Sequence, residues 1–459
     1  MDSLTHQAKL KHDHRVIEAK KLLLDAVKEQ QKDIKGVKPA TTELKTSYEQ
    51  AIKTFSHERG GDLFYPYIGS GFGKGPFVEL LDGSIKYDMI AGVGVHHFGH
   101  NHPEIMSTAI DAALSNTVMQ GGLQQNVDSI ELTELLIKES KLDHCYLTSS
   151  GAMANENGLK IAFQKNSPAS RILAFEKNFS GRTLILVDIS DKAANREGMP
   201  NYAHVDYIPF YDAKRPEEST KRAVEVLKCH LSRYPKQHAV MLFELIQGEG
   251  GCYAGTKEFF SSLMKVLKEH HIAILIDEIQ TLGRTSKLFA FQHFGLEEYA
   301  DIVTIGKLAQ VCATLYKKEW KPKPGLIAQT FTSSTAAIKV AKTLIQMMFR
   351  DHFFGADGKN MTVNKLFTQN FEEIAKRHPN TIHGPFGLGG MIAFTPFEGN
   401  ATKTKEFSME LFNEGVLSFG AGSHPYRVRF LPPIGAITPE DIHAVSAIIE
   451  KTIGKLCTS

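Results

Sequence analysis

The sequence of 459 residues lacks the usual features of a secreted or membrane protein. Its five cysteines are dispersed and odd in number, which argues against a disulfide framework and favours a reducing compartment. No apolar run reaches the length of a membrane-spanning helix. The first thirty residues are rich in Lys, Asp, Glu and His, unlike a signal peptide. We therefore expect a cytoplasmic protein that has no membrane partner.

A strong net charge of either sign is also missing. Lysine and arginine number 53 against 51 aspartates and glutamates, which leaves a formal net charge of +2. This balance does not favour nucleic acid or anionic lipid as a partner. The length suggests two or three structural domains. We expect an N-terminal arm and hairpin segment over 1–90, a large domain over 91–350 and a small C-terminal domain over 351–459.

The first 90 residues combine a helical arm with a β-hairpin. Apolar residues of the arm recur at helical spacing and form one stripe, made of Val16, Ala19, Leu23 and Val27. Asp82-Gly83 separates two strand-like runs at 77–81 and 85–89. Because Asp-Gly is a preferred pair for a two-residue turn, these runs are predicted to form the hairpin.

From residue 144 onward, strand-like and helix-like segments alternate, which is typical of a mainly parallel sheet covered on both faces. The predicted strands lie at 144–148, 171–176, 183–189, 239–246, 272–279 and 301–305. The predicted helices are clearest at 152–164, 217–232, 256–270 and 335–350. The C-terminal part is predicted to be α+β, with helices near 361–377, 402–414 and 439–455 and strands near 389–395 and 427–430.

Two of the predicted strands end in residues that suit a cofactor. The run that begins at Ile272 ends in Asp277, and the run at 300–307 ends in Lys307. A lysine amine can form an imine with a carbonyl group, and a buried carboxylate needs a cation such as a protonated ring nitrogen. Either residue alone is a weak signal, since lysines at strand ends usually extend to solvent.

Two further motifs follow predicted strands. Ser150-Gly151-Ala152 exposes backbone N–H groups at a helix start, which is either an anion site or a simple capped turn. In Asn-Phe-Ser-Gly-Arg, Phe179 is either a core residue or the cover of a flat ring. Arg182 in the same motif matches the shape of a substrate carboxylate.

A third motif, Phe-Glu-Leu-Ile-Gln-Gly-Glu-Gly-Gly, places Glu244 and Glu249 among three glycines at a strand end. Acidic residues near glycines are usually solvated loop residues. Here acids follow successive predicted strands, whose carboxyl ends meet at one edge of a parallel sheet. That repetition favours a ligand site.

In order and spacing, these motifs resemble those of class III pyridoxal-phosphate aminotransferases, from about residue 60 to the end. The segments around Glu249 and around Lys307, with Gln310-Val-Cys312 after it, are most similar to L-lysine 6-aminotransferases and then to ornithine aminotransferases. The resemblance implies an α/β protein of fold-type I. It would have a large domain with a mainly parallel sheet and a small α+β domain built from both chain ends. Two copies would form a homodimer with shared active sites.

The resemblance also implies a role for single residues. Lys307 would hold pyridoxal phosphate covalently and move a proton, and Asp277 would keep the ring nitrogen protonated. Gln280 would bind the 3-hydroxyl of the ring, and Phe179 would stack on the ring. The phosphate would be held by Ser150, Gly151, Ala152 and, from the partner subunit, Thr330. Substrate carboxylates would involve Arg182, Glu249 and Arg429, and no metal is expected.

The implied reaction moves the terminal amino group of L-lysine or ornithine to 2-oxoglutarate, giving a semialdehyde and glutamate. A 4-aminobutyrate or acetylornithine aminotransferase, an aminomutase and a degenerate homologue are the alternatives. Two departures from the family pattern bear on substrate preference. Thr281 runs directly into Leu282-Gly283-Arg284, one residue shorter than usual, and Ser333-Ser334-Thr335 replaces the usual Gly-Gly-Asn.

Overall fold

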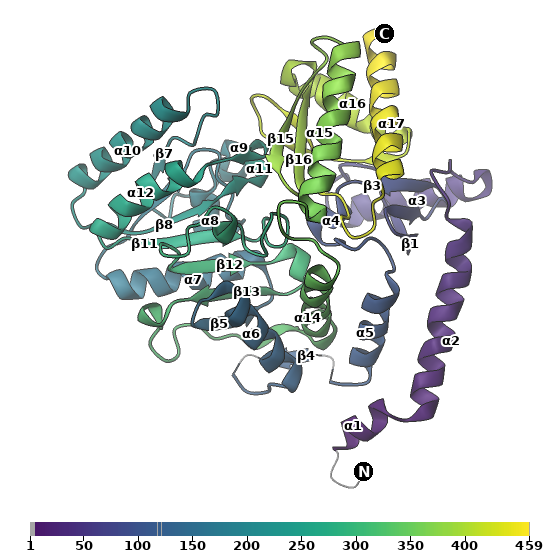
Figure 1. The fold of residues 1–459 in the computed structure, drawn as a ribbon, viewed down its shortest axis with the longest axis horizontal. Coiled ribbons are helices and arrows are strands. Elements are labelled where there is room, and N and C mark those ends of the chain that lie inside the picture. The colour runs from purple at the N-terminus through teal and green to yellow at the C-terminus, as the bar shows by residue number, and fades with distance from the viewer. Residues whose placement is uncertain (1–4, 117, 121, 459) are drawn as a thin grey trace.

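A seven-stranded sheet forms the centre of the computed structural model, which describes residues 5–116, 118–120 and 122–458 (Figure 1). The strand order is β5-β13-β12-β11-β8-β6-β7, and only β13 runs antiparallel to its neighbours. The sheet is therefore mainly parallel, as the alternating pattern predicted. Its strands are β5 (His144–Thr148), β6 (Arg171–Phe175), β7 (Val205–Ile208), β8 (His238–Glu244), β11 (Ala273–Glu278), β12 (Ile302–Ile305) and β13 (Cys312–Tyr316).

Helices cover both faces of this sheet, so its strands are apolar along their whole length. Successive side chains of β11 illustrate this, because Ile274 joins one hydrophobic cluster and Leu275 joins the other. One face packs on α7 (Gly151–Asn166) and α8 (Leu184–Ile189). The other packs on α6 (Val127–Ser140), α10 (Pro216–Arg233), α12 (Lys257–Glu269) and α14 (Thr335–Arg350).

The strand predicted at 183–189 is wrong, because this run forms the helix α8. The Thr183 hydroxyl accepts a hydrogen bond from the Leu186 amide and caps the first turn. Short apolar runs cannot be assigned to strand or helix by periodicity alone. β6 pairs with β8 on one side and with β7 on the other. Neither β7 nor the antiparallel strand β13 was predicted.

Both chain ends contribute to the smaller sheets, as the resemblance implied. The predicted hairpin is present as β2 (Phe77–Leu80) and β3 (Ile85–Asp88), and β3 pairs in parallel with the C-terminal strand β17 (Val416–Leu417). β1 (Gly69–Lys74) completes this sheet. The second sheet contains β15 (Ile382–Leu388), β16 (Met391–Pro396), β18 (Phe419–Ala421) and β19 (Arg427–Phe430).

The C-terminal helices α15 (Lys359–Arg377), α16 (Ala401–Asn413) and α17 (Pro439–Thr458) pack on these sheets (Figure 1). Short elements complete the description: α4 (Ala91–Gly94), α5 (Pro103–Ala113), α9 (Ala193–Arg196), α11 (Gly248–Gly251), α13 (Ala290–His293), and the strand pairs β4 (Val118–Gln120) with β14 (Phe331–Ser334) and β9 (Ile246–Gln247) with β10 (Tyr253–Ala254).

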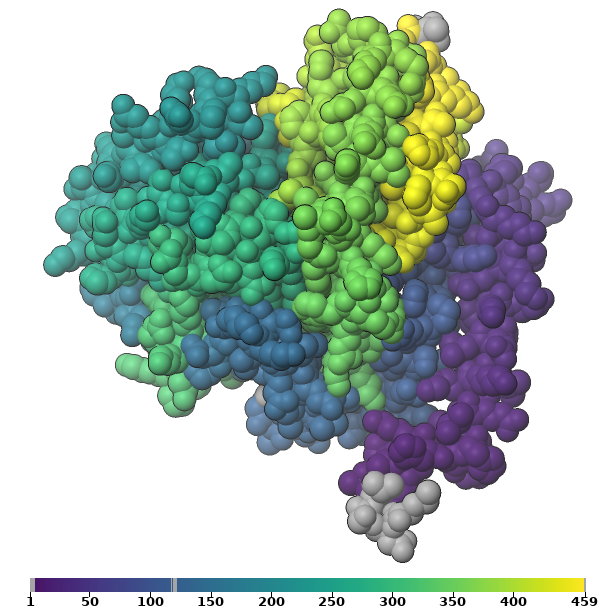
Figure 2. Space-filling model, viewed as in Figure 1, coloured from purple at the N-terminus to yellow at the C-terminus, as the bar shows by residue number. Residues whose placement is uncertain are grey.

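The N-terminal arm consists of α1 (His6–Lys11), α2 (His14–Gln30) and α3 (Thr42–Glu58). Figure 2 shows the arm, in purple, along one edge of the molecule. The predicted helix is confirmed, but its apolar stripe is only partly covered, since Leu23 is 54% exposed. Lys20 binds Asp111 of α5 at 2.9 Å and attaches the arm to the large domain. Among the described helices, none combines the length and apolarity needed to cross a membrane.

Candidate active site

Most of the predicted site residues meet in one cavity at the carboxyl ends of β8, β11 and β12. Parallel strands bring residues that are far apart in the sequence to one sheet edge. The cavity has a volume of ≈ 470 Å³ and is lined by Val93, Gly151, Ala152, Phe179, Ser180, Gly181, Arg182, Glu244, Glu249, Asp277, Ile279, Gln280, Lys307, Phe419 and Arg429. Two predicted residues, Ser150 and Thr330, are not among the lining residues.

Lys307 follows β12 in an unusual backbone conformation. Its backbone φ is +46°, in a region that residues other than glycine adopt only under strain. Burial lowers the pKa of the Lys307 ammonium, while the nearby Asp277 acts in the opposite direction. A lysine whose pKa is lowered provides more of the neutral amine that reacts with a carbonyl group.

Asp277 is the penultimate residue of β11, and its side chain is almost completely buried. The carboxylate accepts hydrogen bonds from the Ile279 amide at 2.9 Å and from Asn155 Nδ2 at 2.7 Å. Burial raises the pKa of Asp277, and those hydrogen bonds and Lys307 oppose the shift. A buried carboxylate of this kind is stabilised by a cationic partner, which a protonated pyridine nitrogen provides.

Asn155 is a site residue that the sequence reasoning missed. It is fully buried in α7, donates also to the Ser180 carbonyl at 2.7 Å, and accepts from Thr304 Oγ at 2.7 Å. It shares the buried face of the helix with Leu159. A polar residue on that apolar face was the signal that could have revealed it.

Glu244 stands beside Asp277 in the register of the parallel strands β8 and β11. Burial and, to a smaller extent, the Asp277 carboxylate raise the pKa of Glu244 well above its ordinary value, so the two carboxyl groups disfavour each other's ionisation. Its oxygens accept from the amides of Phe179 at 3.1 Å and Gly248 at 3.0 Å. Glu244 thereby holds both loops that border the cavity.

The start of α7 provides an anion site. Ser150 caps the helix by accepting from the Met153 amide at 3.1 Å, and Gly151 and Ala152 line the cavity with their first-turn N–H groups. Gly181 has φ +136°, and a Cβ there would lie 3.3 Å from the Ala152 Cβ. Glycine therefore lets the loop that carries Phe179 approach the helix start closely.

These groups fit pyridoxal phosphate. The first turn of α7 suits a phosphate, Asp277 suits the ring nitrogen, and Lys307 suits the aldehyde carbon. Phe179 and Ile279 provide apolar surface for the flat ring. Gln280 accepts from Arg429 Nη1 through Oε1 at 3.2 Å, which leaves its Nε2 to donate to the ring oxygen.

Four further charged residues line or approach the cavity. Arg429 is only 1% exposed and donates through Nη2 to Glu249 Oε2 at 3.3 Å. The other carboxylate oxygen of Glu249 accepts from Lys192 Nζ at 2.6 Å. Arg182 is exposed at the mouth and donates to Asn195 Oδ1 at 3.2 Å. Lys192 was not predicted, since it follows the run that was assigned to a strand.

The shortened segment after Thr281 keeps a structural role. Arg284 is fully buried and donates to the carbonyls of Gly94 at 2.7 Å and Gly390 at 3.2 Å. Burial lowers its pKa to about 9. Arg284 thus connects the segment after β11 with the N-terminal and C-terminal parts of the chain.

Thr330 is exposed and lies just before β14, away from the cavity of its own chain. The resemblance implied no metal. Within the described ranges, no group of three or more His, Cys, Asp or Glu side chains is arranged to bind a metal ion.

Comparisons with known proteins identify the family. The profile of the family described as "Aminotransferase class-III" matches residues 69–453. An acetylornithine aminotransferase from Bacillus subtilis is 30% identical over 385 residues, covering 82% of this chain and 92% of the relative. One from Caldanaerobacter subterraneus is 28% identical over 397 residues, covering 84% of this chain and 94% of the relative.

Solved structures share the fold at lower identity. A lysine aminotransferase from M. tuberculosis has a TM-score of 0.78 at 20% identity and covers 88% of this chain and 99% of its own. An ornithine aminotransferase from Toxoplasma gondii has a TM-score of 0.75 at 22% identity, with 89% and 98% covered. The chain belongs to the class-III aminotransferases, enzymes of fold-type I that use pyridoxal phosphate.

Proposed function

We propose that this aminotransferase moves the terminal amino group of a basic amino acid, L-lysine or ornithine, to 2-oxoglutarate, giving a semialdehyde and glutamate in the cytoplasm. The observation that carries this proposal is the pair of Glu249 with Arg429 deep in the cavity, with Arg182 at its mouth. Bound pyridoxal phosphate supplies the ring that accepts electrons while nitrogen passes between the substrates.

The cofactor would be held by residues on three sides. Ser150, Gly151 and Ala152 would bind the phosphate, with Thr330 of a second subunit. Asp277 would keep a positive charge on the ring nitrogen, and Gln280 would donate to the ring oxygen. Phe179 would cover the ring face. The amine of Lys307 would hold the cofactor and later move a proton at the reacting carbon.

The two arginines suit carboxylates at two distances from the reacting atom. A basic amino acid that reacts at its terminal amine has its α-carboxylate far from the ring, where Arg182 lies at the mouth. An α-keto acid reacts next to its carboxylate, which needs Arg429 deep in the cavity. While Glu249 occupies Arg429, the α-carboxylate of the donor cannot bind there, and reaction at the α-amine is disfavoured.

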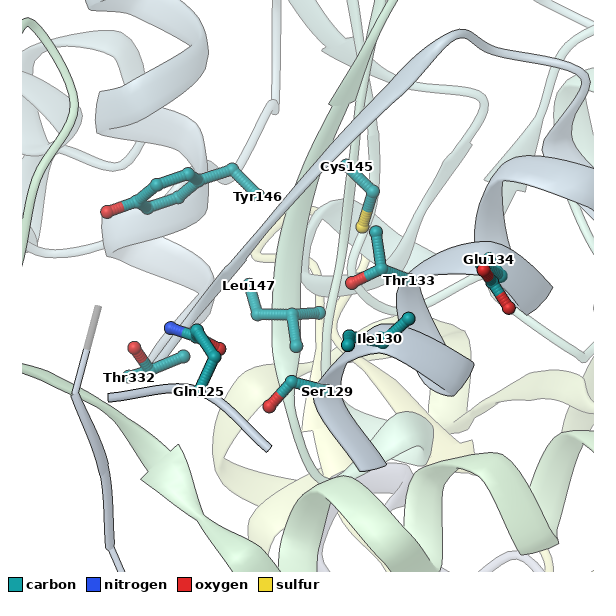
Figure 3. Close-up of a pocket in the computed structure, with 9 residues that line it drawn as sticks. All are labelled: Gln125, Ser129, Ile130, Thr133, Glu134, Cys145, Tyr146, Leu147 and Thr332. Atoms are coloured by element: carbon teal, nitrogen blue, oxygen red, sulfur yellow. The ribbon is translucent and has the colours of Figure 1, made fainter. Parts of the chain in front are cut away.

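The proposal includes a homodimer. Thr330 is exposed and directly precedes Phe331, which is also exposed and belongs to β14. Further exposed apolar residues lie in β4, which pairs with β14, in the segment after it and in the first turn of α6, namely Val118, Leu123, Val127 and Ile130. A cavity of ≈ 330 Å³ opens next to this surface, between α6, β5 and β14 (Figure 3). Covering the apolar surface with a second copy would remove it from water and bring Thr330 toward the other active site.

An acetylornithine aminotransferase is the second candidate, because the curated relatives described above carry that name. Acetylornithine also has a terminal amine and a distant carboxylate, so the two arginines would serve it equally. Its blocked α-amine removes the need for Glu249 to prevent reaction at the wrong nitrogen. 4-Aminobutyrate, another alternative donor, has no α-amino acid group, so the site would not need an arginine for an α-carboxylate of the donor.

A donor screen with 2-oxoglutarate tests the proposal. Purified holoenzyme is given L-lysine, ornithine, N-acetylornithine or 4-aminobutyrate, and glutamate and the aldehyde product are measured. We expect the highest kcat/KM with lysine or ornithine. Preference for N-acetylornithine would establish the second candidate. Rearranged donor without any glutamate would indicate an aminomutase and contradict the proposal.

A further inference from the structure

Glu249 lies between two cations, and its contact with the outer one is the shorter. Its Oε1 is 2.6 Å from Lys192 Nζ, whereas its Oε2 is 3.3 Å from Arg429 Nη2. The Arg429 side chain is 1% exposed and the Lys192 side chain is 42% exposed. The carboxylate therefore joins a buried guanidinium to an ammonium that contacts solvent.

A second, smaller cavity lies on the Lys192 side of Glu249. It has a volume of ≈ 40 Å³, and its lining includes Lys177, Asp191, Lys192 and Glu249. Glu249 also lines the active-site cavity and therefore borders both spaces, as Phe179 does. The backbone of Glu249 is held by the Gly422 amide, which donates to its carbonyl at 2.8 Å. The carboxylate already contacts Lys192, so only its contact with Arg429 has to break for the guanidinium to become available.

The backbone of Lys192 is tied to the loop that covers the ring. The Lys192 amide donates to the Ser190 carbonyl at 2.9 Å, and the Asp191 amide donates to the Asn178 carbonyl at 2.8 Å. The Ser190 hydroxyl accepts from the Ser180 amide at 3.0 Å. Because these contacts surround Phe179, Lys192 keeps a defined position relative to the active site.

We propose that Lys192 is a positioning residue that holds the Glu249 carboxylate when it leaves Arg429 and so makes Arg429 available to the carboxylate of the α-keto acid. This inference rests on the proposed function. A carboxylate that left Arg429 without another partner would lose a charge-assisted hydrogen bond in a partly dry site. With Lys192 in place, Glu249 keeps one cationic partner when it leaves Arg429. The arrangement in which Arg429 is free for a substrate carboxylate therefore becomes easier to reach.

The test uses Lys192→Met, which keeps most of the side-chain length and removes the charge. Binding of glutarate to the holoenzyme is measured by calorimetry, and each half-reaction is followed in single turnovers. We expect glutarate binding and the half-reaction with 2-oxoglutarate to weaken by about three- to tenfold, given a partly exposed charged contact. The half-reaction with the basic donor should change much less. Lys192→Arg should restore both properties.

Lys177→Met is the matched control, because Lys177 lines the same small cavity but its ammonium lies 4.6 Å from the Tyr253 ring centroid. It should bind glutarate like the wild type. In a Glu249→Ala background, Lys192→Met should have no further effect, since the carboxylate that it positions is gone. A loss of affinity that persists there would mean that Lys192 binds the dicarboxylate directly and would overturn the proposal.

The calorimetric measurement separates this inference from the proposed function. Equal glutarate affinity in the wild type and Lys192→Met would overturn the role of Lys192, while the donor screen could still establish the reaction. A donor screen that yields no glutamate would overturn the proposed function. The positioning role of Lys192 would still be supported if Lys192→Met weakened glutarate binding and had no such effect in the Glu249→Ala background.

Discussion

Asn155 donates a hydrogen bond of 2.7 Å to the carboxylate of Asp277, although the two residues are 122 positions apart in the chain. The same amide nitrogen donates to the Ser180 carbonyl, and its oxygen accepts from Thr304. One buried side chain therefore orients the carboxylate of β11 and connects it with the loop that carries Phe179. The orientation of the Asp277 carboxylate in the cavity depends on this contact.

Asp277→Asn should reduce turnover by several orders of magnitude, because the amide cannot stabilise a positive charge on the ring nitrogen. Asn155→Ala keeps the carboxylate but removes its orientation, so we expect a smaller loss of about 10- to 100-fold. Single-turnover rates and the absorbance of bound cofactor measure both effects. Near-normal turnover in Asp277→Asn would show that the ring nitrogen lies elsewhere.

Lys307→Ala should bind the cofactor only non-covalently and lose turnover by several orders of magnitude, since the reactive amine is absent. In the wild type, borohydride treatment followed by peptide mass analysis should locate the reduced cofactor on Lys307. Lys317→Ala, at a position outside the cavity, is a control that should keep the label. A label on another lysine would refute the assignment.

Glu249→Ala should speed the half-reaction with glutamate relative to that with lysine or ornithine, because Arg429 becomes free for an α-carboxylate. Arg182→Ala should impair lysine more than 4-aminobutyrate, which has no α-carboxylate. Single-turnover rate constants for each donor measure the change. An unchanged ratio between the two half-reactions in Glu249→Ala would remove the physical support for terminal-amine specificity.

The homodimer with shared sites predicts complementation between two impaired variants. Thr330→Ala should weaken cofactor retention, and Lys307→Ala should be inactive. In a mixed dimer, one site would combine Lys307 of one subunit with Thr330 of the other, and that site should be fully active. Activity measured after the two proteins are unfolded and refolded together checks this. If Thr330 served its own subunit, mixing would not raise activity, and sedimentation of an active monomer would contradict the dimer.

His97 predicts an acid-sensitive stability. The ring is fully buried, and neither nitrogen has a hydrogen-bond partner among the described residues. Burial and, to a smaller extent, Arg284 lower its pKa well below the ordinary value. The unfolded chain therefore binds a proton more readily. The contribution of His97 to the free energy of unfolding is therefore fully present above a pH of about 6.5. Below that pH the free energy of unfolding falls by about 1.4 kcal/mol for each pH unit, until the pKa of His97 in the folded state is reached.

His97→Leu should flatten this dependence, and urea denaturation between pH 5 and 7.5 measures the free energy of unfolding for both proteins. His443→Leu, at an exposed position of α17, is the control. Equal pH slopes in His97→Leu and the wild type would mean that the pKa of His97 is the same in the folded and unfolded states, which would contradict the prediction.

The order of the strand-end motifs is enough to identify the family and the cofactor. Lys307, Asp277 and the Ser150-Gly151-Ala152 turn each follow a strand or precede a helix, and such local patterns depend on residues next to one another in the chain. The same locality explains the error at 183–189, because a short apolar run has no periodicity that separates a strand from a helix.

Only the tertiary structure decided which side chains meet across the sheet edge. Asn155 reaches Asp277 because α7 packs on β11 and β12. Lys192 reaches Glu249 across 57 positions because its loop is joined by a backbone hydrogen bond to the loop of Phe179. The Phe179 amide in turn donates to Glu244 at the end of β8. Pairings of this kind arise from the docking of whole elements, so nothing in the local sequence determines them. The sequence by itself therefore determined the chemistry of the strand ends, and the packing of the elements decided which partners hold and orient those residues.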